Sequence, residues 1–346
     1  MATIVYGIAG EGWGHAVHSR AIIDELSKHH DVIILGGRKA YAYFKKRHAR
    51  RIASLVIHYR KGGVSKLGTA AVNITRSPLY AASLIKVMGI MMREKPDVVV
   101  SDFEPFTAYA AMILKIPLVH VSNQYLRTHS TLRTPSRFKE GRWSANAMNR
   151  IIGPRGHNYV ITSFTDEKPV PGACIIPPPL RAEIARLKPK DGKHLLAYQT
   201  SKSDKRLHGI LAKAGVPCVV YGFGAKPSRD NVNYKEFNEQ TFYQDLADAK
   251  AVITNGGHNL MVEALYLHKP VLSIPVRKQY EQVCNAVCLQ RMGYGMMTAK
   301  LTEKNVQEFV KALPRYKAAL RKMKWRDDGA VLAATMIERY IRTKQR

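Results

Sequence analysis

Two residues that could exchange a proton with a substrate stand where predicted strands end. His15 closes the glycine-rich run 10–14, which follows a strand-like apolar run at residues 4–6. Asp102 follows the apolar residues 98–100 and Ser101. Because the carboxyl ends of parallel strands share one edge of a sheet, we expect both side chains to open into the same cleft. A histidine titrates near neutral pH, so it is suited to act there as a general base.

Each of these residues also has a purely structural interpretation. A lone histidine is more often part of the packing. Either Asp102 or Glu104, and Asp102 in particular, could instead cap a helix that we expect to begin near Pro105. Glu104 is a second candidate for the base. His18 lies one helical turn after His15, but a His-x-x-His pair without a third ligand is weak support for a metal site, and we expect none.

A second stretch, residues 251–274, has the pattern of a strand, a glycine turn, a helix and another strand. The turn is Asn255-Gly256-Gly257, and its glycines let the backbone bend tightly and approach a ligand closely. The helix behind it would point unpaired N–H groups and its positive dipole end at that ligand, which favours phosphate. Glu263, about one turn into the helix, is placed to accept hydrogen bonds from a ribose diol. An ordinary β–α connection is the alternative.

Both stretches resemble the signatures of nucleotide-sugar glycosyltransferases of the two-Rossmann-domain type, called GT-B. The similar families are the lipid-linked N-acetylglucosaminyl transferases of peptidoglycan synthesis (family 28), the UDP-glycosyltransferases, and a group of archaeal and bacterial relatives. The run 10–15 is similar to their N-terminal glycine loop, which ends in histidine. In the second half the resemblance rests on these residues: Gly257, Asn259, Glu263, Lys269-Pro270, Ile274-Pro275, Glu281-Gln282 and Asn285-Ala286.

The resemblance implies an α/β protein of GT-B fold, with two Rossmann-like doubly wound domains facing a central cleft. It implies an inverting, metal-independent transferase that uses a UDP-sugar as donor substrate and needs no cofactor. In such enzymes His15 would be the base and Asp102 would orient it. Many relatives carry histidine where this chain has Asn255, so a side-chain contact to phosphate is not carried over there. The donor site would comprise Gly14, Phe237, Asn238, Asn255, Gly256, Gly257, His258, Asn259, Glu263, Glu281 and Gln282.

The length of 346 residues suffices for two domains. Three prolines at 177–179 mark the expected boundary, because they end a strand and stiffen the crossing. We therefore expect an N-terminal acceptor-binding domain at residues 1–178 and a C-terminal donor-binding domain at residues 179–325. By the resemblance, residues 326–346 would form a helix that crosses back to the first domain.

The net charge of +29 is far larger than solubility requires. The 62 residues from Val32 to Arg93 hold thirteen Lys and Arg and no Asp or Glu. Such a span indicates a polyanionic partner, either nucleic acid or an anionic membrane surface. The basic segments 60–78 and 124–156 are expected to be long loops or mobile helices that contact the acceptor. The candidates are Arg60, Lys61, Lys66, Arg127, Arg133 and Arg137.

The charge favours a nucleic-acid acceptor, such as a hydroxymethylated pyrimidine in phage-type DNA. One alternative is a membrane-associated enzyme that acts on a lipid or lipid-linked acceptor. Another is a non-catalytic module that binds polyanions.

The sequence has no segment that indicates a membrane span or secretion. No run reaches the roughly 18 apolar residues that cross a bilayer. The N-terminus does not have the pattern of a signal peptide, and the four cysteines lack zinc-type pairing. We therefore expect a cytoplasmic protein, with a peripheral position at the inner face of the membrane as the alternative.

Overall fold

The computed structural model describes residues 1–60, 63–154, 158–199, 206–323 and 328–344. The chain forms two compact units, each described here by itself. Unit 1 comprises Met1–Arg181 and Arg326–Arg346, and unit 2 comprises Ala182–Trp325. The break thus falls after Arg181, close to the three prolines, and the C-terminal segment belongs to unit 1.

Unit 1 is built on a parallel sheet of seven strands in the order β3-β2-β1-β6-β7-β8-β9. The order reverses at β1, which has β2 on one side and β6 on the other, so a ligand crevice is expected at the carboxyl ends of β1 and β6. The strands are β1 (Thr3–Ile8), β2 (Asp31–Gly36), β3 (Arg50–Arg51), β6 (Val98–Asp102), β7 (Leu118–Val121), β8 (Tyr159–Thr162) and β9 (Ala173–Ile176). A separate antiparallel pair is formed by β4 (Tyr59–Arg60) and β5 (Gly63–Val64).

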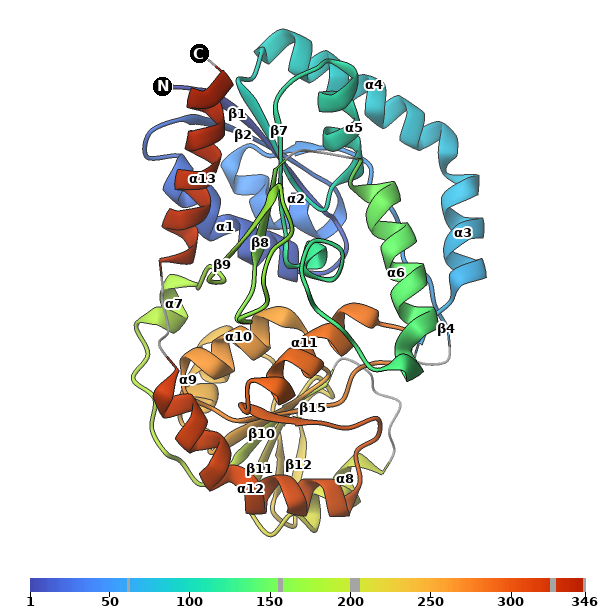
Figure 1. Ribbon diagram of the computed structural model, residues 1–346. Helices are drawn as coiled ribbons and strands as arrows, with labels where there is room; N and C mark the ends of the chain where they lie inside the picture. The colour runs from blue at the N-terminus through green and yellow to red at the C-terminus, as the bar shows by residue number, and fades with distance from the viewer. Residues whose placement is uncertain (61–62, 155–157, 200–205, 324–327, 345–346) are drawn as a thin grey trace. The chain divides into compact units, whose positions relative to one another are not determined.

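Helices cover both faces of this sheet (Figure 1). Successive strand residues point to opposite faces, so Val100 packs with Ile337 of α13 while Val99 packs with Met91 of α4. Helices α1 and α2 lie with α13 on the first face, and α5 lies with α4 on the second. The helices are α1 (Gly14–Leu26), α2 (Arg38–Phe44), α3 (Lys66–Thr75), α4 (Ser77–Glu94), α5 (Pro105–Ile113), α6 (Lys139–Ile152) and α13 (Gly329–Lys344), with short 3₁₀ turns η1 (Lys45–Arg47), η2 (Asn123–Arg127) and η3 (Ser136–Phe138).

Unit 2 repeats this plan with the strand order β12-β13-β11-β10-β14-β15-β16. All its pairings are parallel except that of the edge strand β12. The order reverses at β10, so the corresponding crevice is expected at the carboxyl ends of β10 and β14. The strands are β10 (Leu195–Tyr198), β11 (Cys218–Tyr221), β12 (Lys226–Arg229), β13 (Val232–Tyr234), β14 (Ala251–Thr254), β15 (Val271–Ser273) and β16 (Gly295–Met297).

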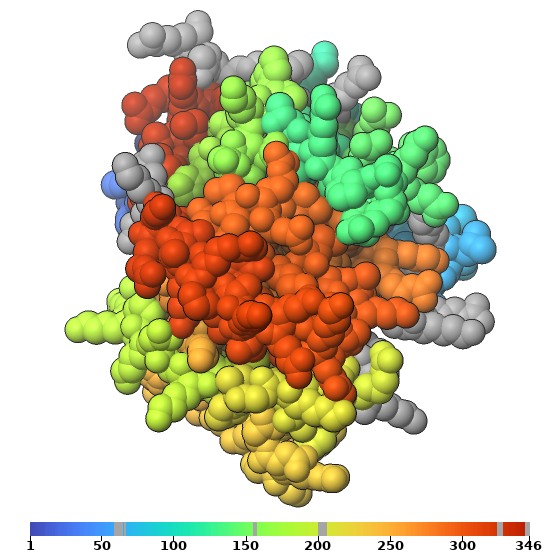
Figure 2. Space-filling model, turned by 60° about the horizontal axis from the view of Figure 1, so that its bottom comes forward, coloured from blue at the N-terminus to red at the C-terminus, as the bar shows by residue number. Residues whose placement is uncertain are grey.

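The helices of unit 2 bury an apolar stripe against its sheet. Phe309 of α12 lies in one core cluster with Ile253 of β14 and Leu211 of α8. The outer side of α12 is visible as red-orange atoms in Figure 2. The helices are α7 (Ala182–Ala185), α8 (Leu207–Ala212), α9 (Glu239–Ala247), α10 (His258–Tyr266), α11 (Tyr280–Arg291) and α12 (Glu303–Lys322).

The two basic segments contain helices, one of the two alternatives expected from the sequence. Residues 66–75 and 77–94 form α3 and α4, and residues 139–152 form α6. Ser65 caps α3 by accepting a hydrogen bond from the backbone N–H of Gly68, and Pro78 stands in the first turn of α4, where proline is tolerated. None of the described helices is both long enough and apolar enough to cross a bilayer.

Candidate active site

The side chains of His15 and Asp102 meet at the point where the strand order of unit 1 reverses. Asp102 is the last residue of β6 and pairs in register with Ile8, the last residue of β1. His15 is the second residue of α1, which begins after the glycine loop that follows β1. Nδ1 of His15 lies 2.8 Å from Oδ1 of Asp102. The predicted proximity of the two residues is thus observed.

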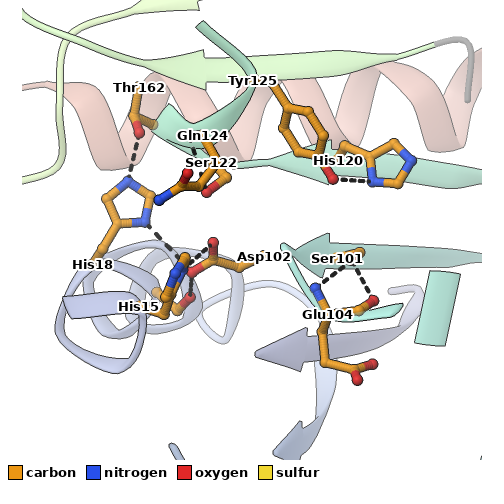
Figure 3. A network of polar contacts seen from close by, with 11 residues as sticks. His15, His18, Ser101, Asp102, Glu104, His120, Ser122, Gln124, Tyr125 and Thr162 are labelled. Carbon is orange, nitrogen blue, oxygen red and sulfur yellow. Dashed lines mark hydrogen bonds and ion pairs between the residues drawn. The ribbon is translucent and has the colours of Figure 1, made fainter. Parts of the chain in front are cut away.

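Neighbouring histidines and hydrogen bonds keep Asp102 ionised although it is buried. Its side chain is 1% exposed, whereas that of His15 is 18% exposed. Burial acts to raise the pKa of the Asp102 carboxyl, but the neighbouring His15 and His18 and the hydroxyl of Ser19 outweigh it, so the net pKa lies below its usual value. Ser19 donates its Oγ–H to Oδ2 of Asp102 at 2.8 Å. The carboxylate is therefore anionic and held by two side chains of α1 (Figure 3).

His18 is a second buried histidine beside the same carboxylate. Its Nε2 lies 2.8 Å from Oγ1 of Thr162, the last residue of β8, and its Nδ1 lies 4.0 Å from Oδ2 of Asp102. Burial lowers the pKa of His18, which favours the neutral ring. Within the described residues no cluster of three or more His, Cys, Asp or Glu could hold a metal ion. In this chain His18 is therefore a buried link between α1 and β8.

Glu104 has the capping role that was considered for Asp102. It is the N-cap of α5, and its carboxyl oxygens accept hydrogen bonds from the backbone N–H groups of Phe106 and Thr107. Burial raises the pKa of Glu104 to about 7. Its side chain points away from His15 and Asp102 (Figure 3). The capping interpretation of Asp102 is wrong, because Asp102 faces α1, and Glu104 is engaged at the start of α5.

The dyad fixes the orientation of the His15 ring. Because Nδ1 faces the carboxylate, a proton taken up by His15 would enter at Nε2, and the negative charge of Asp102 would stabilise the resulting imidazolium. Phe103 lies parallel to the imidazole, with ring centroids 6.1 Å apart and an interplanar angle of 2°. Phe103 has a φ of 54°, so the chain turns sharply after Asp102. This arrangement is chemically suited to general-base catalysis.

In unit 2 the glycine turn follows β14 at the corresponding reversal of strand order. Gly256 has a φ of 87°, and a Cβ there would stand 2.6 Å from Oγ of Ser273, so only glycine fits. Asn285 of α11 donates a hydrogen bond from Nδ2 to the carbonyl oxygen of Gly256 at 3.1 Å. Gly257 is the N-cap of α10, which runs from His258 to Tyr266. The turn thus leads into the amino end of a nine-residue helix, where an anion is favoured.

The remaining predicted donor residues surround this turn in different ways. Glu263 is in the second turn of α10 and is 4% exposed. Gln282 accepts a hydrogen bond at Oε1 from the backbone N–H of Val276 at 2.9 Å, and Glu281 precedes it in the first turn of α11. Asn255 donates from Nδ2 to the carbonyl oxygen of Ile274 at 3.2 Å. Asn255 therefore joins the ends of β14 and β15.

Phe237 and Asn238 stand at the beginning of α9. Asn238 is its N-cap and accepts a hydrogen bond at Oδ1 from the backbone N–H of Thr241. Phe237 is 48% exposed, and its ring centroid lies 5.4 Å from that of Phe242 and 6.3 Å from that of Tyr198, which ends β10. An exposed aromatic ring that packs at its edge against other rings is suited to stack on a nucleobase.

The six predicted acceptor residues differ in their surroundings. Arg127 is held by Oε1 of Gln124 and Oδ1 of Asn149, whereas Arg133 and Arg137 are exposed. The backbone of Arg60 is in β4 and that of Lys66 begins α3. Lys61 lies outside the described residues.

Several residues that shape these sites were missed by the sequence analysis. Ser19 contacts Asp102, Thr162 contacts His18, and Ser273 lies against the Gly256 turn. Asn285 was part of the resemblance, but its hydrogen bond to the carbonyl oxygen of Gly256 was not predicted. Helical spacing placed Ser19 one turn after His15, which was an available signal for Ser19. Thr162 is 144 residues from His18 in sequence, so only the fold brings these two together.

The sequence and the fold both match known glycosyltransferases. The model of the family described as Glycosyl transferase family 1 matches residues 2–314. An uncharacterized glycosyltransferase of Methanosarcina acetivorans is 27% identical over an alignment 348 residues long, gaps included. The alignment covers 88% of this chain and 87% of that protein. The UDP-N-acetylglucosamine--N-acetylmuramyl-(pentapeptide) pyrophosphoryl-undecaprenol N-acetylglucosamine transferase of Shouchella clausii is 24% identical over 270 residues, or 70% of this chain and 72% of that protein.

A similar fold is found in solved structures. UGT2 of Phytolacca americana, solved with UDP-2fluoro-glucose and pterostilbene, aligns with a TM-score of 0.66 at 13% identity, over 97% of this chain and 99% of that one. The two doubly wound sheets, the match along most of the sequence and these similarities agree with one another. The chain belongs to glycosyl transferase family 1 and is a glycosyltransferase of the GT-B fold.

Proposed function

We propose that this glycosyltransferase moves a sugar from a UDP-sugar to a hydroxyl group of its acceptor with inversion at the anomeric carbon and without a metal ion. The observation that carries the proposal is the 2.8 Å contact between Nδ1 of His15 and Oδ1 of the buried Asp102. This contact gives the enzyme a base that is oriented and electrostatically stabilised at the crevice of unit 1.

The reaction is a single displacement. Nε2 of His15 takes the proton of the acceptor hydroxyl while the oxygen forms a bond to the anomeric carbon. The bond between that carbon and the diphosphate oxygen breaks, and UDP leaves with the electron pair. Attack from the face opposite the leaving group inverts the anomeric configuration. The amino end of α10 would stabilise the charge that develops on the diphosphate.

The donor assignment draws on residues of unit 2 and on the relatives. Glu263 would accept hydrogen bonds from the ribose, the turn at Gly256 and Gly257 would receive the diphosphate, and the Phe237 ring would stack on the base. The name of the Shouchella clausii enzyme specifies a UDP-sugar, and the Phytolacca americana structure holds a UDP-sugar analogue. Both support UDP as the nucleotide.

For the acceptor we favour a lipid at an anionic membrane over nucleic acid. The basic composition fits both partners, because each presents phosphates. Helices α3, α4 and α6 of unit 1 also carry exposed apolar side chains, among them Leu67, Ile85 and Trp143. A bilayer can take up such side chains. The Shouchella clausii enzyme, by its name, acts on a pyrophosphoryl-undecaprenol acceptor, which is a lipid.

The experiment that tests this function measures sugar transfer directly. The full chain is incubated with a panel of radiolabelled UDP-sugars, with an anionic lipid extract in one arm and hydroxymethylated DNA in the other. The proposal expects label in the lipid fraction, UDP as co-product and loss of both with His15→Ala. Label on DNA alone would replace the lipid acceptor by nucleic acid, and the absence of label in both arms would contradict the proposed acceptors.

A further inference from the structure

Exposed apolar side chains are concentrated on one part of unit 1. Apart from Met1, fourteen large apolar residues among the described residues are exposed, and thirteen of them belong to unit 1. Ten of these lie on the four helices α3, α4, α5 and α6. Scattered single apolar residues are normal on a surface, but such a concentration indicates an interaction site.

Helix α3 has its polar side toward the protein and its apolar side toward solvent. Thr69 accepts a hydrogen bond from the backbone N–H of His58, and Asn73 donates from Nδ2 to the carbonyl oxygen of Val56. Leu67 and Ile74, on the opposite side of the helix, are 87% and 70% exposed. Between Lys66 and Arg76 the sequence has no charged residue. This orientation is the reverse of that of an ordinary surface helix, whose apolar stripe faces the core.

Helix α4 continues this apolar surface. Its exposed positions include 78, 81, 82, 85, 89 and 92, which recur at the three- and four-residue spacing of one helix face, and all six residues are apolar or glycine. Ile85 is 69% exposed. The opposite face buries Val87 and Met91 in the core of unit 1. Helix α4 therefore has apolar residues on both sides, which a purely structural role does not require.

Basic residues adjoin the apolar ones. Arg76 stands between α3 and α4 and is exposed, and α6 carries exposed Arg142 and Arg150 beside Trp143, which is 76% exposed. Helix α3 contacts α4, α4 packs along α5, and α5 contacts α6. Figures 1 and 2 both show α3 and the segment that leads into α6 on the same flank of unit 1.

We propose that the apolar-basic face of α3, α4 and α6 docks unit 1 onto an anionic bilayer. We define this face by Leu67, Ile74, Leu79, Ile85, Trp143 and Ile151, with the neighbouring arginines. Its apolar side chains enter the boundary between headgroups and acyl chains, and Arg76, Arg142 and Arg150 contact the phosphates. A nucleic-acid backbone would satisfy the arginines but offers no partner for Leu67, Ile74 and Ile85.

The docking proposal rests on the proposed function in one respect, namely that the acceptor lipid lies in the bilayer to which unit 1 binds. Binding is therefore tested without turnover. The full chain is mixed with vesicles of phosphatidylcholine alone, with vesicles that contain phosphatidylglycerol, and with duplex DNA, at low and high salt. Arginine–phosphate attraction weakens with salt, whereas apolar insertion does not, so we expect a salt-resistant part of the binding to phosphatidylglycerol vesicles.

The decisive variant is Leu67→Ser/Ile74→Ser, which alters two exposed positions of α3. We expect it to lose at least tenfold in affinity for phosphatidylglycerol vesicles and to lose the salt-resistant part, while its circular dichroism and its affinity for UDP stay unchanged. Val331→Ser is the matched control, because it removes an exposed apolar side chain from α13. It should bind vesicles like the wild type.

Three outcomes would overturn the docking proposal. One is vesicle binding by the double variant that equals that of the wild type. Another is binding of the wild type to duplex DNA but not to vesicles, and the third is vesicle binding that disappears entirely at high salt. Each of these leaves the assignment of His15 as base intact, whereas a His15→Ala variant with full turnover would contradict the catalytic proposal and leave vesicle binding unaffected.

Discussion

Nδ1 of His15 lies 2.8 Å from Oδ1 of Asp102, although 87 positions of sequence separate the two residues. The contact arises because β1 and β6 are adjacent parallel strands whose carboxyl ends coincide, with Ile8 paired to Asp102. The sheet thereby fixes the candidate base at the start of α1, which follows β1, close to the carboxylate at the end of β6. The catalytic proposal depends on this relationship.

Replacement of His15 by alanine should impair catalysis and spare donor binding. We expect kcat to fall by about 10²–10⁴, the usual range for loss of a general base. The affinity for UDP, measured by calorimetry, should not change, because the predicted UDP-binding residues Phe237, Gly256, Gly257 and Glu263 all belong to unit 2. Turnover at the wild-type rate would remove His15 from the role of base.

Ser19 should act through Asp102, as a positioning residue. Without its hydroxyl the Asp102 carboxylate loses a donor, becomes more basic, and stabilises the imidazolium of His15 more strongly. The same change also loosens the carboxylate that orients the His15 ring. Because of this lost positioning we expect Ser19→Ala to lower kcat by about tenfold, the size of one hydrogen bond to a charged group. The acid limb of the pH profile of kcat/KM should move to higher pH.

The matched control for this variant is Ser27→Ala, which makes the same change at the exposed C-cap of α1. A purely structural role of Ser19 would lower the thermal stability and leave the pH profile where it is. That result would count against a role through Asp102.

Variants of Glu263 and Glu281 should distinguish binding of the nucleotide from binding of the sugar. Glu263→Ala should weaken the binding of UDP by about 1.5–3 kcal/mol, which is roughly 10- to 150-fold, because a charged acceptor of ribose hydrogen bonds is lost. Glu281→Ala should leave the affinity for UDP unchanged and weaken the binding of the UDP-sugar. Calorimetry with both ligands distinguishes the two variants, and equal effects on UDP would contradict the assignment.

His120 should make the stability of unit 1 depend on pH. Its ring is fully buried, with Nδ1 3.2 Å from the hydroxyl oxygen of Tyr125 and Nε2 3.2 Å from the carbonyl oxygen of Pro154. Burial lowers the pKa of His120 to about 4. The neutral form is therefore favoured in the folded state, so this contribution is present above the unfolded pKa of about 6.5 and is lost as the pH falls toward 4.

Between pH 7 and pH 5 the free energy of unfolding should consequently fall by about 2 kcal/mol through His120. His120→Phe removes the titrating group, so its unfolding free energy from urea titrations should fall less over the same interval, by about that amount, whatever its absolute stability. An identical decrease in the two proteins would mean that His120 is not a source of the acid sensitivity.

Much of this organisation could be predicted from the sequence because it depends on local patterns. Glycine turns between a strand and a helix mark both reversals of strand order, and the apolar runs that end at Asp102 and Thr254 mark the strands. The partner of His18 could not be predicted from local patterns. Thr162, at the end of β8, lies beside His18 only because of the order of the strands in the sheet. The sequence left open which carboxylate caps α5, since Asp102 and Glu104 both closely precede Pro105, and in the structure Glu104 is the cap.

The face of α3 shows a different limit of prediction. The spacing of Leu67 and Ile74 is that of one helix face, and the usual inference is that such a face lies against the core. In the structure Asn73 and Thr69 lie against the chain instead, and the apolar side is exposed. Which side of an amphipathic helix faces solvent depends on its tertiary partners, here the segment around Val56 and His58.

The most direct test of the central claim is the anomeric configuration of the product together with its dependence on His15. Nuclear magnetic resonance of the isolated product, made from a UDP-α-sugar, reports the configuration at the new glycosidic bond. We expect the wild type to form a β-linked product and His15→Ala to form at least a hundredfold less of it at the same time of incubation. An α-linked product, or equal yields from the two proteins, would contradict the central claim.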